Sequence, residues 1–138
     1  MTTDQKSLVR ETFAKVVPIA DTAAGLFYGR LFEMDPSLRP LFRNDIGAQG
    51  KKLMQMIGYC VGKLDALDEL VPAVKELGRK HEGYGVEEED YATVGSALLW
   101  TLEQGLGAAF TPEVAAAWTA VYELLAATMI EGAKSAAA

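Results

Sequence analysis

Helical spacing of apolar residues repeats along almost the whole chain, and it limits the fold more than any other feature. Along Leu53, Ile57, Cys60 and Leu64 the steps are three or four residues, while the two-residue alternation of strands is hard to find. Prolines and glycines divide this pattern into successive helices. A chain of 138 residues is long enough to bury a sizeable core. We therefore expect an all-α protein in which residues 1–138 form a single domain.

The expected helices run from about residue 4 to 17, 19 to 33, 48 to 64, 70 to 83, 87 to 106 and 112 to 132. Pro36 and Pro40 forbid a long helix between the second and the third, so short turns are expected there. Gly25 and Gly29 leave bare backbone where another helix could approach closely. The last four residues are expected to fray.

Composition excludes several classes of partner. A net charge of −6 argues against binding nucleic acid or an anionic membrane surface. Cys60 is the only cysteine, so neither an internal disulfide nor a thiolate zinc cluster can form. The first residues do not form a signal peptide, and no uncharged apolar run approaches the roughly 20 residues of a membrane span. We expect a reduced, soluble, cytoplasmic protein.

His81 is the only histidine in the chain and the first candidate for chemistry. It follows Leu70, Val74 and Leu77 on one helical face, and Gly83 would end the helix just beyond it. A lone imidazole that projects inward from the last turn of a helix can be the single axial ligand of a planar iron cofactor. The alternative interpretation is a core histidine bonded to a backbone group.

Three other side chains could face an interior ligand. Tyr28 would carry its hydroxyl into the core, where a buried phenol needs a hydrogen-bond partner. Gln49 is the polar exception at the start of an apolar stripe, and either sits at the edge in water or points a donor into a pocket. Phe42, in the proline-rich corner, either plugs the core or stacks on a flat ligand. Each has a purely structural alternative.

Several kinds of enzyme site lack their residues. No dinucleotide fingerprint or phosphate-binding loop is present, and a nucleophilic triad would have to use His81. One histidine without clustered carboxylates does not suit a catalytic zinc or di-iron site. Iron in a macrocycle differs, because the macrocycle supplies four ligands and the protein needs to supply only one.

Five segments together give the chain a family resemblance. They are LFYGRLFEMDPSLRPLF at 26–42, AQGKKLMQ at 48–55, ELGRKHEGYGV at 76–86, DY at 90–91 and AAWTAVYELLA at 116–126. On these segments the chain resembles a globin, and most closely the bacterial single-domain haemoglobins and the globin domain of flavohaemoglobins. The resemblance implies the globin fold, a three-over-three helical sandwich around a haem pocket, with haem b (iron protoporphyrin IX) as the cofactor.

The resemblance also implies roles for individual residues. His81 would be the proximal ligand of the iron, and the carbonyl of Leu77, one turn back, is a natural acceptor for its second N–H. Phe42 would stack on the haem, and Tyr91 would lie near the proximal side. The distal residues would be Tyr28, Gln49 and, as the apolar residue over the iron, Leu53.

One departure from the family pattern lies on the last helix. The family usually has a glutamate there, linked to the proximal histidine and to the tyrosine at position 91. Counting from Trp118 and Tyr122, its place falls at Ala133, and Glu131 lies two residues away and off that helical face. The relay that makes the proximal imidazole more basic therefore lacks its carboxylate at this position.

Four functions remain in competition. The first is reversible binding of O2 at a five-coordinate ferrous iron, with high affinity from hydrogen bonds of Tyr28 and Gln49. The second is a nitric oxide dioxygenase that takes electrons from a separate reductase, and the third is a gas sensor, with NO and CO as further ligands. The fourth is a helical domain without haem. The sequence leaves open whether the protein is a monomer or a homodimer.

Overall fold

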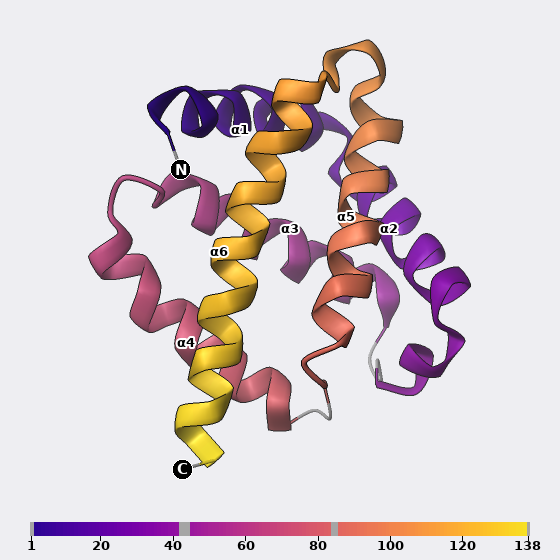
Figure 1. Cartoon of the computed structure of the whole chain (residues 1–138). Coiled ribbons are helices and arrows are strands. Elements are labelled where there is room, and N and C mark those ends of the chain that lie inside the picture. Colours follow the sequence, from indigo (N-terminus) through magenta and orange to yellow (C-terminus); the bar gives the residue numbers. More distant parts are fainter. Residues whose placement is uncertain (1, 42–44, 84–85, 138) are drawn as a thin grey trace.

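The chain folds into helices joined by short connections (Figure 1). The structure is a computed structural model that describes residues 2–41, 45–83 and 86–137. Its helices are α1 (Thr3–Val16), α2 (Ala20–Met34), α3 (Ile46–Gly62), α4 (Leu67–Gly83), α5 (Asp90–Leu106) and α6 (Pro112–Ala137). Short 3-10 helices η1 (Val17–Ile19), η2 (Pro36–Leu41) and η3 (Gly107–Ala109) lie between them, and these described ranges contain no strand.

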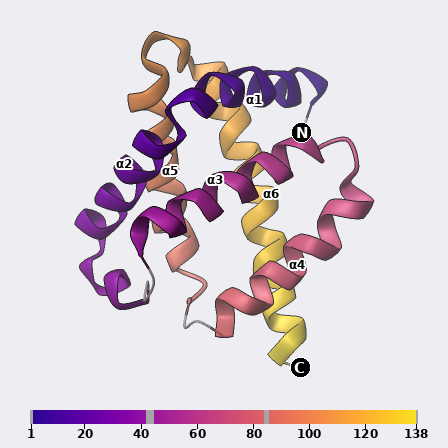
Figure 2. The same cartoon turned by 180° about the vertical axis from the view of Figure 1, so that it is seen from behind.

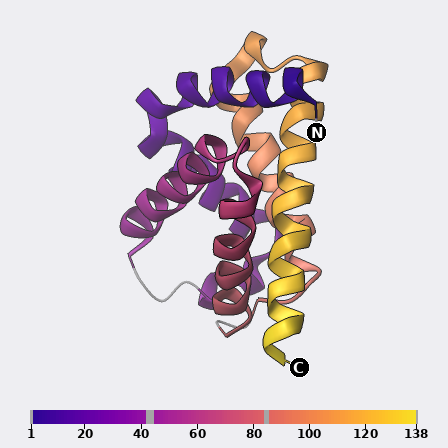
Figure 3. The same ribbon diagram turned by 90° about the vertical axis from the view of Figure 1, so that its left-hand side faces the viewer.

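The helices form two layers of three. Helices α2, α5 and α6 make one layer, and α1, α3 and α4 make the other, as the two opposite views show (Figure 1 and Figure 2). Contacts of α4 and α1 with α6, and of α3 with α2, join the layers. The side view shows α6 running along nearly the full height of the molecule (Figure 3). The expected all-α, three-over-three architecture is confirmed.

Helix ends follow local chemistry. Thr2 and Gln5 form a capping box at the start of α1, because each side chain accepts from the other's backbone N–H at 3.0 Å. The Thr111 hydroxyl accepts from the backbone N–H of Val114 ahead of α6, as its Thr-Pro sequence predicts. Gly107 follows α5 with a φ of 55°, which favours glycine.

Two helix boundaries differ from expectation. Helix α5 begins at Asp90, so the acidic residues 87–89 precede it and do not form its first turn. The Asp90 carboxylate accepts from the backbone N–H of Glu87, which holds the chain in a turn before the helix. Helix α6 continues to Ala137. The expectation that the tail frays is therefore wrong for residues 135–137.

Trp118 anchors the centre of the core. Its side chain is 2% exposed and packs with Val9, Val16 and Val121. The indole Nε1 donates to the Thr12 hydroxyl oxygen at 2.8 Å, and that hydroxyl donates to the carbonyl of Leu8 at 2.7 Å. Helical spacing relates residues within α6 and gives no sign of this partner on α1.

The expected close approach at Gly25 and Gly29 is wrong. Both glycines are exposed, and a Cβ atom built at either would meet nothing within 4 Å. They lie on the solvent side of α2, whose buried face carries Ala24, Phe27, Tyr28 and Leu31. The close approach to α2 is made instead from α3, where a Cβ on Gly50 would lie 2.8 Å from the Cβ of Ala24.

Helix α6 is long and apolar enough between Pro112 and Lys134 to cross a membrane, judged by length and composition alone. The central helix of a globular core meets the same criterion. In this fold α6 places Val114, Ala117 and Val121 in the core beside Trp118, which accounts for its apolar character.

We expect Thr12→Val to lower the free energy of unfolding by roughly 1–3 kcal/mol, because the buried indole N–H of Trp118 loses its acceptor while the side-chain shape is kept. Urea unfolding of the variant measures this loss. Thr22→Val, at an exposed position of α2, is the matched control and should change stability little. Equal effects of the two substitutions would contradict the role given to the Thr12–Trp118 bond.

Candidate functional site

His81 lies near the end of α4 with its ring orientation fixed by the backbone of its own helix. Its Nδ1 lies 2.8 Å from the carbonyl oxygen of Leu77, one turn earlier. A carbonyl oxygen only accepts, so Nδ1 carries the hydrogen and donates it. The nitrogen that would coordinate a metal is therefore Nε2. The bond to Leu77 that the sequence predicted is present.

Burial keeps the His81 imidazole neutral. It lowers the pKa of His81 below the ordinary value of 6.5, and this effect outweighs the hydrogen bond with Leu77, which raises the pKa. A neutral imidazole whose Nδ1–H is bonded to a carbonyl is the form that binds metal ions in proteins.

Tyr28 and Gln49 meet across the contact between α2 and α3. Tyr28 is only 3% exposed, and its ring packs edge-on against Phe27 with centroids 5.0 Å apart. Burial raises the pKa of Tyr28 to about 12, and a side-chain hydrogen bond from Gln49 lowers it to a smaller extent. Tyr28 is therefore a neutral phenol, and the half-buried Gln49 is bonded to it by its side chain.

Gly50 makes this meeting possible. It follows Gln49 directly, and a Cβ there would clash with Ala24 and would lie 3.9 Å from the ring of Tyr28. A larger residue would push α3 away from α2 and separate the two polar side chains. Gly50 is not among the residues predicted from the sequence, because a glycine inside a helical stripe does not show which helix it faces.

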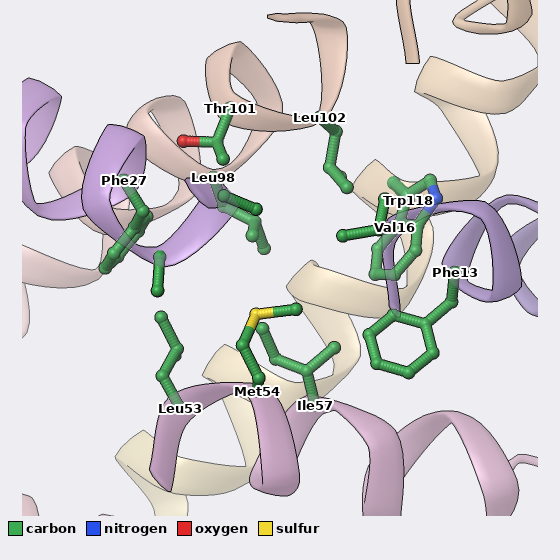
Figure 4. Close-up of a pocket in the computed structure, with 12 residues that line it drawn as sticks. Phe13, Val16, Phe27, Leu53, Met54, Ile57, Leu98, Thr101, Leu102 and Trp118 are labelled. Carbon is green, nitrogen blue, oxygen red and sulfur yellow. The ribbon is translucent and has the colours of Figure 1, made fainter. Parts of the chain in front are cut away.

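Leu53 lies between two adjoining apolar cavities. The larger, of about 90 Å³, is lined by Phe27, Leu53, Ile57, Cys60, Val61, Val94, Leu98, Trp118, Val121, Tyr122 and Leu125. The smaller, of about 20 Å³, shares five of these residues, and Figure 4 shows Leu53, Met54 and Ile57 of α3 pointing across it toward α5 and Trp118. Burial raises the pKa of Cys60 to about 11, so its thiol is also uncharged.

The arrangement of α3 and α4 places Gln49 and His81 on opposite arms of a V. The helices diverge from the turn at residues 63–66 that joins them (Figure 2). Gln49 is near the start of α3 and His81 near the end of α4, so both belong to the open end of the V. Helix α3 packs on α1 and α2, whereas α4 packs on α6.

The chemistry of these donors suits a haem, although His81, Tyr28 and Gln49 line neither of the two cavities described above. One neutral imidazole stands on α4, a phenol and an amide belong to α2 and α3, and apolar Leu53 lies on α3 with Gln49. The residues described contain no group of three or more His, Cys, Asp or Glu side chains that could hold a bare metal ion. A metal already ligated by a macrocycle needs only the single imidazole.

Tyr91 lies in the first turn of α5 and is half-buried. Its carbonyl accepts a hydrogen bond from the Tyr122 hydroxyl of α6 at 2.6 Å. Gly95 makes room for that ring, because a Cβ at this position would lie 2.7 Å from Cε2 of Tyr122. The place of Tyr91 on the proximal side stays a prediction, and Phe42 lies outside the described residues.

Glu131 does not replace the carboxylate that the family pattern places at position 133. Its side chain is 66% exposed and pairs with the ammonium group of Lys75 at 3.2 Å. It is engaged on the surface of the contact between α4 and α6. The departure at Ala133 noted in the sequence therefore has no substitute from this neighbour.

A family model for globins matches residues 25–129. The chain belongs to the globin family. A neuroglobin of Danio rerio is 30% identical over 92% of this globin and 89% of the relative. A flavohemoprotein of Bacillus subtilis (strain 168) is 32% identical over 92% of the chain, which spans 33% of that relative. Membership of this family implies that the chain binds haem.

A solved structure shows the same fold at low sequence identity. It is a hexacoordinated heme protein from an anhydrobiotic tardigrade, with a TM-score of 0.88 at 19% identity, covering 97% of this globin and 96% of that chain. At this sequence identity, the likeness shows that the two chains share a fold.

The stability of the haem-free chain should depend on pH through His81. Below pH 6.5 the unfolded chain gains a proton that the native chain, with its lower pKa, does not yet bind, so acid favours unfolding. We expect the free energy of unfolding to fall between about pH 7.5 and 5.5, with a slope from this group of at most about 1.4 kcal/mol per pH unit. His81→Gln should flatten the slope in urea titrations. Equal slopes in both proteins would show that His81 is not the group responsible.

Proposed function

We propose that this globin binds O2 reversibly at haem b, with Nε2 of His81 as the proximal ligand. The observation that carries the proposal is the pairing of two polar side chains, Tyr28 of α2 and Gln49 of α3, in a fold that holds a neutral His81 imidazole on α4. The haem supplies an iron that coordinates diatomic gases. The chain supplies one axial nitrogen, an apolar surround and two distal donors.

The distal pair would set the affinity. A dioxygen ligand draws negative charge, so a donor nearby stabilises it more than it stabilises an uncharged gas such as CO. Hydrogen bonds to charged acceptors contribute roughly 1.5–3 kcal/mol each. One such bond corresponds to roughly tenfold to more than a hundredfold in affinity. With the amide of Gln49 bonded to the Tyr28 oxygen, the phenol hydrogen is oriented by its neighbour and can be donated to the gas. Tight binding and slow release follow.

The iron is proposed to be five-coordinate when no gas is bound, although the tardigrade protein of the same fold is hexacoordinated. His81 is the only histidine, so this chain has no second imidazole to offer. The Tyr28 phenol would have to lose its proton to become a strong ligand, and its pKa of about 12 opposes that. Gln49 is held by its bond with Tyr28.

A second function uses the same site. The resemblance to the globin domain of flavohaemoglobins implies nitric oxide dioxygenation, in which NO, O2 and one electron give one nitrate ion, and a flavohemoprotein is among the relatives. Residues 1–138 contain neither a flavin nor a nicotinamide motif, so the electron would come from a reductase outside this globin domain. Nitrate yield per NO, measured with a supplied reductase, distinguishes this activity from simple gas binding.

The haem-binding part of the proposal is tested by absorption spectra of the purified chain after addition of haem. The wild-type protein should show a Soret band in its ferric, ferrous and oxygenated forms. His81→Ala should lose most of the bound pigment, because it removes the protein's only axial imidazole. Unchanged pigment content and gas uptake in the variant would overturn the assignment of His81.

Tyr28→Phe should speed O2 release by at least about tenfold, since it removes a hydrogen bond to a charged ligand and keeps the ring. Stopped-flow measurement of O2 displacement by CO gives this rate. Tyr59→Phe, on the exposed face of α3, is the matched control and should leave it unchanged. A release rate unaffected by Tyr28→Phe would exclude Tyr28 as the main distal donor.

A further inference from the structure

Helices α4 and α6 cross at two glycines that have no room for a side chain. A Cβ on Gly78 would lie 2.0 Å from the carbonyl oxygen of Met129, and a Cβ on Gly132 would lie 2.1 Å from the carbonyl oxygen of Lys75. Both glycines are buried. Real Cβ contacts are essentially never shorter than 3.0 Å, so an added methyl group would require a separation of the two backbones by about 1 Å.

The atoms in this contact belong to backbones on both sides. A side chain could rotate away from an added methyl group, but the carbonyls of Lys75 and Met129 are part of their helices. The ion pair between Lys75 and Glu131 flanks the same crossing at the surface. A larger residue can therefore be admitted only if the backbones of α4 and α6 move apart at this crossing.

The crossing lies within one turn of the proximal ligand. Gly78 directly follows Leu77, whose carbonyl holds Nδ1 of His81 at 2.8 Å, and it precedes His81 by three residues. Residues three apart lie on nearly the same face of a helix. A shift of α4 at Gly78 is consequently carried to His81, because the hydrogen bond with Leu77 ties the ring to this turn.

We propose that Gly78 and Gly132 are positioning residues for His81: their contact sets how far, and at what angle, the imidazole projects toward the haem. This inference rests on the proposed function. The family pattern has a carboxylate one residue beyond Gly132, where this chain has Ala133. Here α6 acts on the proximal ligand through backbone packing.

The test is the iron–imidazole stretching band in resonance Raman spectra of the ferrous, gas-free protein. Gly132→Ala should shift the band relative to wild type by more than the reproducibility of the measurement, because it displaces α4. Gly29→Ala is the matched control, since open space surrounds a Cβ there, and the band should stay in place. An unshifted band in haem-loaded Gly132→Ala would overturn the proposal.

The same substitution in a variant without His81 distinguishes positioning of His81 from a general disturbance of the pocket. In His81→Gly with imidazole added, the axial ligand is no longer attached to α4, so Gly132→Ala should leave the band unchanged. A shift of similar size with free imidazole would overturn the proposal. Absence of an iron–imidazole band from wild type would contradict the proposed function itself.

The folding cost of Gly132→Ala can be offset by Gly25→Ala and Gly29→Ala together. Each replaces an exposed helical glycine with nothing nearby, and each should stabilise α2 because alanine favours the helix more than glycine does. The band is then compared with that of the Gly25→Ala/Gly29→Ala protein. A triple variant that remained unfolded by circular dichroism would show that the crossing serves folding and does not adjust His81, which would also overturn the proposal.

Discussion

The hydrogen bond between His81 and the carbonyl of Leu77 is the interaction on which the proposed site depends. It selects the tautomer, because a carbonyl can only accept, and it fixes the ring so that Nε2 faces away from its own helix. Burial strengthens its effect by lowering the pKa of His81 and keeping the ring uncharged. With a protonated ring, the same fold would present no lone pair to a metal.

The other side of the proposed site also depends on one hydrogen bond, between the side chains of Tyr28 and Gln49. A phenol that is almost completely buried needs a hydrogen-bond partner, and Gln49 supplies one from the neighbouring helix. The partnership requires the close approach of α2 and α3 at Ala24 and Gly50. In the proposed function, gas affinity therefore depends on Gly50. Because this residue has no side chain, α3 lies close enough to α2 for Gln49 to bond with Tyr28.

Much of this could be predicted from the sequence, because helix geometry relates residues three or four apart. The bond of His81 to Leu77 and the cap at Thr111 are local in this sense. The glycine contacts could not be predicted: a glycine inside a helix costs about 1 kcal/mol wherever it stands, and only the packing shows whether Gly25 or Gly50 faces another helix. The partner of Trp118 on α1 is equally remote, 106 residues away along the chain.

Helix α6 connects these parts and bears on which chemistry the site favours. Through Tyr122 it holds the backbone at the start of α5, and at Gly132 it holds α4. It brings no carboxylate to His81 at position 133, and Glu131 is bound to Lys75 instead. A neutral carbonyl draws the imidazole proton less strongly than a carboxylate does, so in the proposed function His81 would be the less basic kind of ligand. Breaking the O–O bond benefits from a strongly electron-donating proximal ligand, whereas reversible binding does not require one. The proximal side thus supports the binding of O2 over its activation, and the distal pair supports holding it tightly.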